Sequence, residues 1–176
     1  MIRVGVNGYG VIGRRITDAV SAQQDMKLIG VTKVKPDYKA RMALEKKYPL
    51  YAATESSMKD FAKNAMEVSG TIEDLLKQVD VIVDASPDDV GAKNKEKYVE
   101  TAGRAVFQGG ESPDVAQVSF VAQCNFEKAR GAKFIRVVSC NTTALCRALH
   151  TIDENFGIER ARAVIARRGA DPDETS

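Results

Sequence analysis

The chain has 176 residues, 44% of them hydrophobic and 28% charged, which is the composition of one globular domain or of one domain with part of another. Its 26 basic and 24 acidic residues give a net charge of +2, so bulk electrostatics argue against nucleic acid or a membrane surface as a partner. Three cysteines without a CxxC pair, a single histidine and no apolar run of roughly 18 residues argue against a disulfide framework, a metal site and a membrane span, so we expect a cytoplasmic protein.

The chain opens on a strand, a glycine turn and a helix. Residues 2–6 are a short β-branched run, three glycines follow, and apolar residues then recur with helical spacing. In the G-x-G-x-x-G pattern, Gly8 permits a tight turn, Gly10 lets the backbone approach a pyrophosphate, and Gly13 lets the helix pack on the strand. We therefore predict a dinucleotide site, with the phosphates at the helix N-terminus near Val11. The alternative is a tight turn with no ligand.

The end of the second strand bears on the choice of cofactor. NAD-preferring folds carry an acidic residue about 20 positions after the glycines, and here the first acid is Asp37, beyond Pro36. Thr32, Lys33 and Lys35 offer a hydroxyl and two ammonium groups instead. These residues favour a 2′-phosphate, so we predict NADP in preference to NAD. The alternative is that the lysines are simply solvated.

Strands and helices alternate through the middle of the chain. We predict a helix over 37–47, a short helix and a weak strand over 50–70, a capped helix from Thr71, a strand over 80–85, a helix through Lys93 and Tyr98, a strand over 105–107, a weak strand over 118–122, a short helix over 126–130 and a strand over 133–138. Because parallel strands end at one edge, Ser86, Pro87 and Gly109-Gly110 are candidates to line the cofactor cleft, although ordinary loops are the alternative.

The last of these strands leads into Ser139-Cys140-Asn141-Thr142-Thr143, at the turn into a helix predicted over 142–156 and capped by Gly157. A cysteine there faces the helix N-terminus, whose unpaired N–H groups favour the nucleophilic thiolate. Backbone N–H groups at Cys140 and Asn141 would also face a developing oxyanion. We predict Cys140 as the nucleophile, whereas Cys124 and Cys146 are expected to be small buried hydrophobic residues.

The alternation predicts an α/β fold, a doubly wound parallel sheet of the Rossmann type, as a dinucleotide-binding domain over residues 1–139. Residues 140–176 are predicted to begin an α+β catalytic domain, which is truncated here, with a strand over 160–168.

Two stretches, residues 4–13 and residues 137–143, resemble glyceraldehyde-3-phosphate dehydrogenase. Thr32-Lys33, Phe107–Glu111 and Arg167–Asp171 look like its archaeal branch. The resemblance implies phosphorylating oxidation of glyceraldehyde 3-phosphate to 1,3-bisphosphoglycerate, a glycolytic step that passes through a thiohemiacetal and a thioester on the cysteine. It implies NADP or NAD as cofactor, inorganic phosphate as second substrate, and a homotetramer for the complete protein.

The resemblance also implies roles for individual residues. Cys140 is the nucleophile; Ser139, Asn141 and Thr142 contact substrate; and the cofactor contacts are Gly8, Gly10, Val11, Ile12, Gly13, Thr32, Lys33, Gly110 and Arg168. Family members continue with most of a catalytic domain and a general-base histidine, so we expect this chain to be the N-terminal half.

The only histidine in the sequence, His150, lies ten residues beyond Cys140 on the predicted helix, about 15 Å of rise, and is expected to be an ordinary helix residue. Two alternatives stay open. The chain is an NADP-binding module without turnover, or it belongs to another Cys-dependent aldehyde or semialdehyde dehydrogenase.

Overall fold

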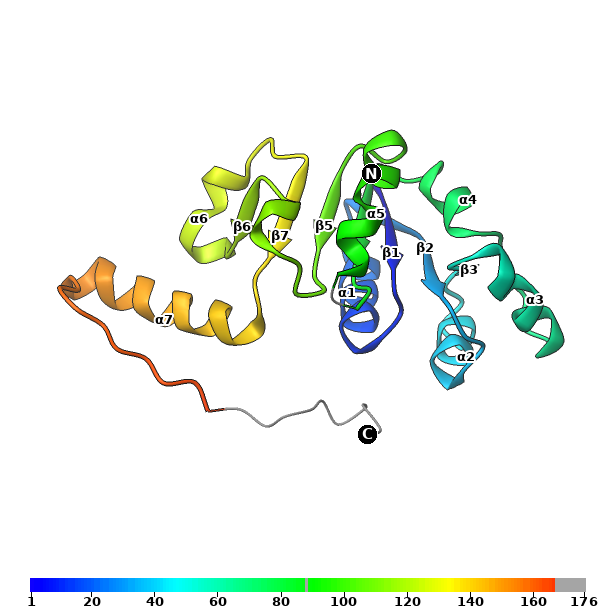
Figure 1. Ribbon diagram of the computed structural model, residues 1–176, viewed down its shortest axis with the longest axis horizontal. Coiled ribbons are helices and arrows are strands. Elements are labelled where there is room, and N and C mark those ends of the chain that lie inside the picture. The colour runs from blue at the N-terminus through cyan, green and yellow to red at the C-terminus, as the bar shows by residue number, and fades with distance from the viewer. Residues whose placement is uncertain (88, 167–176) are drawn as a thin grey trace.

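The computed structural model describes residues 1–87 and 89–166 (Figure 1). Its described part contains a seven-stranded parallel sheet in the order β3-β2-β1-β4-β5-β7-β6. The strands are β1 (Ile2–Asn7), β2 (Met26–Lys33), β3 (Leu50–Ala52), β4 (Val81–Asp84), β5 (Ala105–Phe107), β6 (Val118–Phe120) and β7 (Phe134–Val137). The predicted doubly wound α/β fold is confirmed.

Helices connect the strands. They are α1 (Val11–Ser21), α2 (Tyr38–Glu45), α3 (Glu55–Lys63), α4 (Ile72–Leu76), α5 (Val90–Glu100), α6 (Ala122–Ala129) and α7 (Cys140–Phe156), with a 3-10 turn, η1, over Pro113–Val115. The capping box predicted at Thr71 opens α4, since Asp74 accepts from the Thr71 backbone N–H at 3.0 Å.

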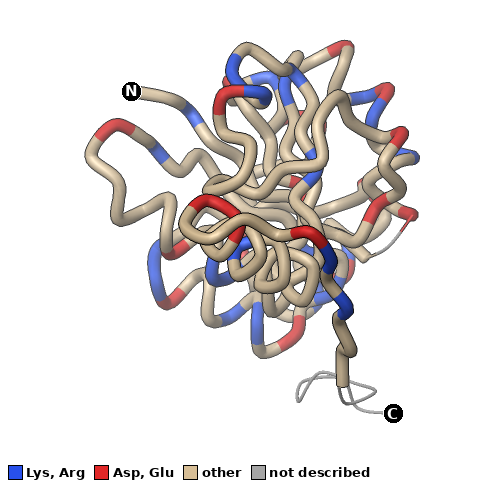
Figure 2. The backbone as a smooth tube through the Cα atoms, turned by 90° about the vertical axis from the view of Figure 1, so that its left-hand side faces the viewer, with Lys and Arg blue, Asp and Glu red and all other residues tan. Residues whose placement is uncertain are grey.

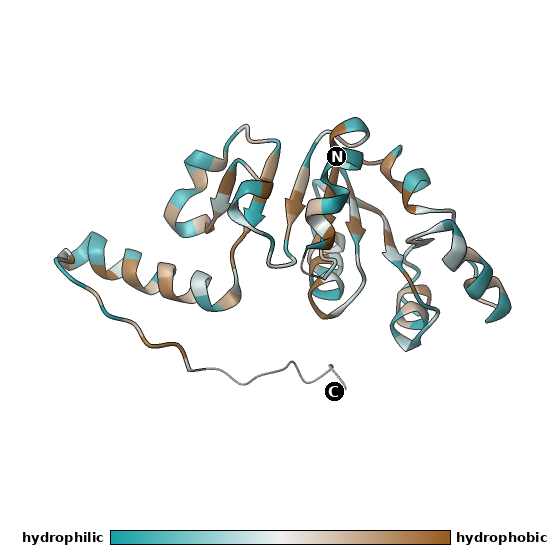
Figure 3. Cartoon of the chain, in the orientation of Figure 1, coloured by the Kyte–Doolittle hydropathy of each residue, from teal (hydrophilic) through white to brown (hydrophobic). Residues whose placement is uncertain are grey.

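Apolar side chains cover both faces of the sheet, as expected for parallel strands. Ile82 and Val83 are neighbours on β4 and point to opposite faces. Val83 belongs to a buried cluster with Val6 and Val31, and Ile82 belongs to a second cluster that includes Leu75, Tyr98 and Phe107. In Figure 3 the most hydrophobic colours follow these central strands.

The strand order reverses between β1 and β4. From β1 the chain builds outward to β2 and β3, and then returns to place β4 on the other side of β1. The crevice outside the carboxyl ends of these two strands is where such folds bind ligands. In Figure 1 the carboxyl ends point to the lower edge of the sheet, where α7 also begins.

The part after the sheet differs from the prediction. Helix α7 packs on α6 but has no buried residue, and residues 158–166 form neither helix nor strand. The strand predicted over 160–168 is therefore wrong for residues 160–166, and residues 167–168 lie outside the described residues. The β-branched pair Val164 and Ile165 suggested a strand, but a strand needs a neighbour to accept its hydrogen bonds, and both side chains are exposed.

Two further findings concern the surface. Figure 2 shows basic and acidic residues interspersed along the backbone. Within residues 1–87 and 89–166, no helix combines the length and the apolar character that crossing a membrane requires.

Candidate functional site

The three glycines of the turn between β1 and α1 differ in how much space a side chain would have. Gly8 has φ +100°, and a Cβ there would lie 2.8 Å from the Ala85 carbonyl oxygen. A Cβ at Gly13 would lie 1.8 Å from the Gly8 carbonyl oxygen, whereas Gly10 has no atom within 4 Å of such a Cβ. Gly8 and Gly13 are therefore needed for the turn and its packing, and the space beside Gly10 is open.

Helix α1 begins directly at this open space. Its N-cap is Gly10, and no side chain caps its first turn. The N–H groups of a first helical turn have no partner within the helix, so those around Val11 and Ile12 are suited to hold an anion. These residues fit the pyrophosphate of a dinucleotide.

Thr32 lies under the glycine turn. Its side chain is fully buried; the hydroxyl accepts from the Gly8 N–H at 3.0 Å and donates to Asn7 Oδ1 at 2.6 Å. Its carbonyl oxygen accepts from the Tyr9 N–H at 3.0 Å. The hydroxyl that we expected beside a 2′-phosphate is thus hydrogen bonded inside the protein.

Lys33 lies in an ion pair at the end of β2. Its Nζ is 2.6 Å from Asp37 Oδ2, and the lysine side chain is only 14% exposed. Asp37 also caps α2, because its Oδ1 accepts from the Ala40 N–H at 3.0 Å. Burial alone would raise the pKa of Asp37, but the bonds from Lys33 and Ala40 outweigh it and the pKa lies below its usual value. The sequence analysis missed this cap and this ion pair.

The exits of β4 and β5 lie against each other, so the prediction that they share one edge is confirmed. The Gln108 N–H donates to the Asp84 carbonyl oxygen at 2.7 Å, and a Cβ on Gly109 would lie 2.3 Å from the Ser86 carbonyl oxygen. The buried Asp84 carboxylate accepts from the Ser86 N–H at 2.9 Å and from its hydroxyl. Gly110 follows with φ +90°.

Glu111 closes this loop. Its side chain is buried, and Oε1 accepts from the Gly91 N–H in the first turn of α5 at 2.7 Å. Oε2 has no hydrogen-bond partner within the described residues. The carboxylate therefore occupies the N-terminus of α5 and ties the loop after β5 to that helix.

Cys140 is the first residue of α7, and its side chain is exposed. The helix starts two residues before the predicted position because Ser139 caps it: Ser139 Oγ accepts from the Thr142 N–H at 3.2 Å and lies 2.9 Å from the Thr142 hydroxyl. The predicted position of the cysteine, after a strand and at a helix N-terminus, is confirmed. Ser139 and Thr142, predicted to contact substrate, bond to each other.

The other cysteines lie between α6 and α7. Cys124 and Cys146 are half-buried, and the Cys124 Sγ lies 3.5 Å from the Cys146 carbonyl oxygen, to which its S–H donates. They are less deeply buried than expected, and α7 as a whole has no buried residue.

Comparison with known proteins identifies relatives over the whole chain. Residues 2–109 belong to the family described as dihydrodipicolinate reductase, N-terminus, and residues 139–176 match the one described as glyceraldehyde 3-phosphate dehydrogenase, C-terminal domain. Proteins named glyceraldehyde-3-phosphate dehydrogenase are 52% identical over 172 residues in Methanothermobacter thermautotrophicus, 56% over 176 in Pyrobaculum neutrophilum and 55% over 174 in Thermococcus kodakarensis. The matches cover 98%, 99% and 99% of this chain.

The chain is similar to archaeal glyceraldehyde-3-phosphate dehydrogenases over nearly its whole length. It spans 51–52% of the length of these three archaeal relatives. These relatives are named as dehydrogenases, and the described part of this chain has the fold of a dinucleotide-binding domain.

The sequence analysis singled out two further residues, His150 and Arg168, that lie after Cys140. His150 Nε2 lies 3.3 Å from Glu154 Oε1, one turn further along the same helix. Arg168, which the resemblance assigns to the cofactor, lies outside the described residues. No group of three metal-ligating side chains occurs in the described ranges.

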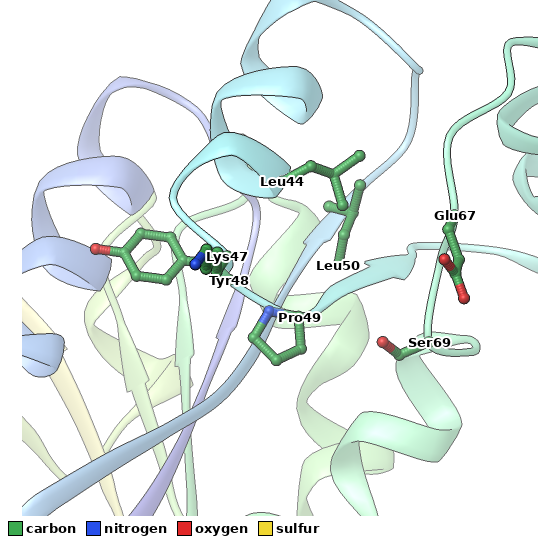
Figure 4. A pocket seen from close by; sticks show the side chains of 7 residues that line it. All are labelled: Leu44, Lys47, Tyr48, Pro49, Leu50, Glu67 and Ser69. Carbon is green, nitrogen blue, oxygen red and sulfur yellow. The ribbon is translucent and has the colours of Figure 1, made fainter.

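A hollow lies where the chain passes from α2 to the start of β3 (Figure 4). Its volume is about 250 Å³, and it is lined by Leu44, Lys47, Tyr48, Pro49, Leu50, Glu67 and Ser69. Leu50 begins β3, so the hollow lies at the amino edge of the parallel sheet, opposite the edge that carries the dehydrogenase motifs.

Proposed function

We propose that this chain is the cofactor-binding and nucleophile-bearing part of a phosphorylating glyceraldehyde-3-phosphate dehydrogenase that prefers NADP to NAD. One observation carries the proposal: the open glycine turn and the exposed Cys140 both follow strands of one parallel sheet, at the edge where its strands end. Residues 1–139 are then the dinucleotide-binding domain, and residues 140–176 begin the catalytic domain.

The cofactor would bind along this edge. Gly8 and Gly13 shape the turn, the N–H groups of Gly10, Val11 and Ile12 would hold the pyrophosphate, and Gly110 and Arg168 would hold the nicotinamide half. When bound, the nicotinamide supplies a hydride acceptor. The open space at Gly10 and the uncapped first turn of α1 support this assignment.

Cys140 would carry the covalent chemistry. Its thiolate would add to the aldehyde carbon and form a thiohemiacetal, and Ser139, Asn141 and Thr142 would contact the substrate. Loss of hydride from that carbon and of the proton from its hydroxyl group would leave a thioester on Cys140. A phosphate oxygen then attacks the thioester carbonyl, the thiolate leaves, and the acyl phosphate is released.

The preference for NADP rests on the end of β2. Lys33 and the exposed Lys35 are the cations there, and Asp37 partly neutralises Lys33. A 2′-phosphate would compete with Asp37 for Lys33, whereas a bare ribose hydroxyl would not.

One observation favours a second function, an NADP-binding module without turnover. Among the described residues, the sequence's one histidine pairs with Glu154 on the helix that follows the nucleophile. A general base must lie within hydrogen-bond reach of the proton that it removes. Ten residues of α-helix separate His150 from Cys140, a rise of about 15 Å, so His150 would not serve as the base for this cysteine.

A turnover assay separates these functions. The purified chain is mixed with glyceraldehyde 3-phosphate, inorganic phosphate and NADP, and NADPH is followed at saturating cofactor, with Cys140→Ser as the matched control. NADPH formation lost in that variant supports the dehydrogenase. Cofactor binding without NADPH formation supports the module, and failure to bind either NADP or NAD contradicts both. Turnover of other aldehydes but not this one would indicate a related semialdehyde dehydrogenase.

The same proposal includes the substrates, the location and the oligomeric state of the complete protein. The substrates are a phosphorylated aldehyde and inorganic phosphate, the location is the cytoplasm, and the complete protein is a homotetramer.

A further inference from the structure

A chain of buried hydrogen bonds connects the two turns that flank the proposed cofactor cleft. It begins at the Gly8 N–H, which donates to the Thr32 hydroxyl, and Thr32 in turn donates to Asn7 Oδ1 at 2.6 Å. Asn7 is the last residue of β1, which pairs with β2 on one side and with β4 on the other.

Asn7 uses both ends of its amide. While Oδ1 accepts from Thr32, Nδ2 lies 2.7 Å from the Tyr98 hydroxyl and 3.3 Å from Asp84 Oδ2, and donates to both. The network thereby crosses from the end of β2 to the end of β4. All four of these side chains are buried, at 6% exposure or less.

Asp84 forms the other end. Its Oδ2 also accepts from the Tyr98 hydroxyl and from Asn94 Nδ2 at 3.2 Å, and its Oδ1 holds the Ser86 N–H and hydroxyl. Burial raises the pKa of Tyr98, so this hydroxyl keeps its proton and remains a donor to the carboxylate.

The four residues have no free polar atom that would make them cofactor ligands themselves. The two ends of the network instead fix backbone at the edge of the cleft: the Thr32 hydroxyl holds the Gly8 N–H in the glycine turn, and the Asp84 carboxylate holds the Ser86 N–H in the loop after β4. A buried network of this kind has one low-energy arrangement, because every alternative leaves a donor or acceptor unpaired.

We propose that Thr32, Asn7, Asp84 and Tyr98 are positioning residues that act as one unit, and that this unit holds the glycine turn and the Ser86 turn in the arrangement that binds the dinucleotide. The inference rests on the proposed function. It goes beyond it by assigning to Thr32 a role through the turn rather than a contact with the cofactor.

The test uses threonine variants that separate shape from hydrogen bonding. Thr32→Val keeps the shape and removes the hydroxyl, so the Gly8 N–H and Asn7 Oδ1 lose their partner, whereas Thr32→Ser keeps the hydroxyl. Thr71→Val is the matched control, because it also removes a threonine hydroxyl from a mostly buried site but at the start of α4. The dissociation constant for NADPH is measured by fluorescence titration, and stability by urea unfolding.

We expect Thr32→Val to weaken NADPH binding at least about tenfold, because two buried hydrogen bonds are lost. Thr32→Ser and Thr71→Val should stay within about threefold of the wild type. Tyr98→Phe, at the far side of the network, should also weaken binding. Because the residues act as a unit, the variant that combines Thr32→Val with Tyr98→Phe should have about the same dissociation constant as the weaker-binding single variant. Independent residues would instead multiply the two losses of affinity.

Unchanged NADPH binding in Thr32→Val, or equal losses in Thr32→Val and Thr71→Val, would overturn the positioning role. If Thr32→Val does not fold, Tyr98→Phe decides: unchanged binding there overturns the proposal, and weakened binding with the wild-type fold supports it. A wild-type chain that binds neither NADPH nor NADH would instead overturn the proposed function, on which this inference rests.

Discussion

At the scale of single residues, Asp37 partly neutralises the positive charge of Lys33 at the end of β2. The two side chains are 2.6 Å apart, and Asp37 also caps α2. Asparagine caps a helix about as well as aspartate but carries no charge. Asp37→Asn therefore removes the charge while keeping the cap.

We predict that Asp37→Asn shifts the ratio of the dissociation constants for NAD and NADP about fivefold further toward NADP, because a partly exposed ion pair contributes about 1 kcal/mol. Parallel titrations with both cofactors measure the ratio. Lys33→Glu is the opposite variant and should reverse the preference. Equal affinity for both cofactors in the wild type and in both variants would show that this pair does not select the cofactor.

A second residue pair gives a pH dependence. Arg3 Nη2 donates to Asp80 Oδ1 at 2.6 Å, and hydrogen bonds from the Arg3 side chain and backbone lower the pKa of Asp80 to about 2. An aspartate pKa that is lower in the folded state adds stability above the unfolded value near 3.9, and that stability is lost as pH falls toward 2.

The expected result is that Asp80→Asn is less stable than the wild type in urea unfolding at pH 6, and that the gap narrows as the pH is lowered from 4 toward 2. The pair is exposed, so the difference is small. A gap that stays constant across this range would contradict the assigned pKa.

At the scale of elements, the start of α7 exposes one cysteine and the contact of α7 with α6 shields two. Cys140 is exposed, and Cys124 and Cys146 are half-buried. We predict that iodoacetamide modifies Cys140 at least several-fold faster than the other two, measured by mass spectrometry of peptides over time. Equal rates for the three thiols would mean that α7 does not hold its position on α6 in solution.

Several elements were predictable because their signals are local. The spacing of Gly8, Gly10 and Gly13 fixed the turn and the start of α1, and the apolar run at 80–85 predicted β4. The strand expected over 160–168 was wrong over its described part because strand pairing depends on a neighbour distant in sequence, which a local pattern does not contain.

The candidate site was likewise predictable only where its signals are local in the sequence. Sequence pattern brought the glycine turn and Cys140 to one sheet edge, but the network under the turn joins residues up to 91 positions apart, Asn7 and Tyr98. The ion pair between Lys33 and Asp37 was missed for another reason: NAD-binding folds carry their acidic residue about 20 positions after the glycines, and Asp37 lies beyond that position.

At the scale of the whole molecule, several large apolar residues that follow the sheet domain are exposed. Phe156 is 85% exposed and Val164 is 91% exposed, while Ile152 and Ile165 are about half-exposed. Brown segments on α7 and on the run after it in Figure 3 mark this surface. Exposed apolar area of this kind promotes association.

We predict that the chain self-associates with rising concentration, and that Phe156→Ser together with Val164→Ser reduces the association. Light scattering at several concentrations measures it. A monomer at every concentration for the wild type would contradict the prediction.

The central claim is that the dinucleotide site and Cys140 belong to one functional edge, so the most direct test asks whether cofactor changes the cysteine. The chain is treated with iodoacetamide with and without saturating NADP, and the modification rate of each cysteine is measured. We predict that NADP changes the rate at Cys140 several-fold and leaves Cys124 and Cys146 unchanged. Full NADP binding with an unchanged Cys140 rate would contradict the claim.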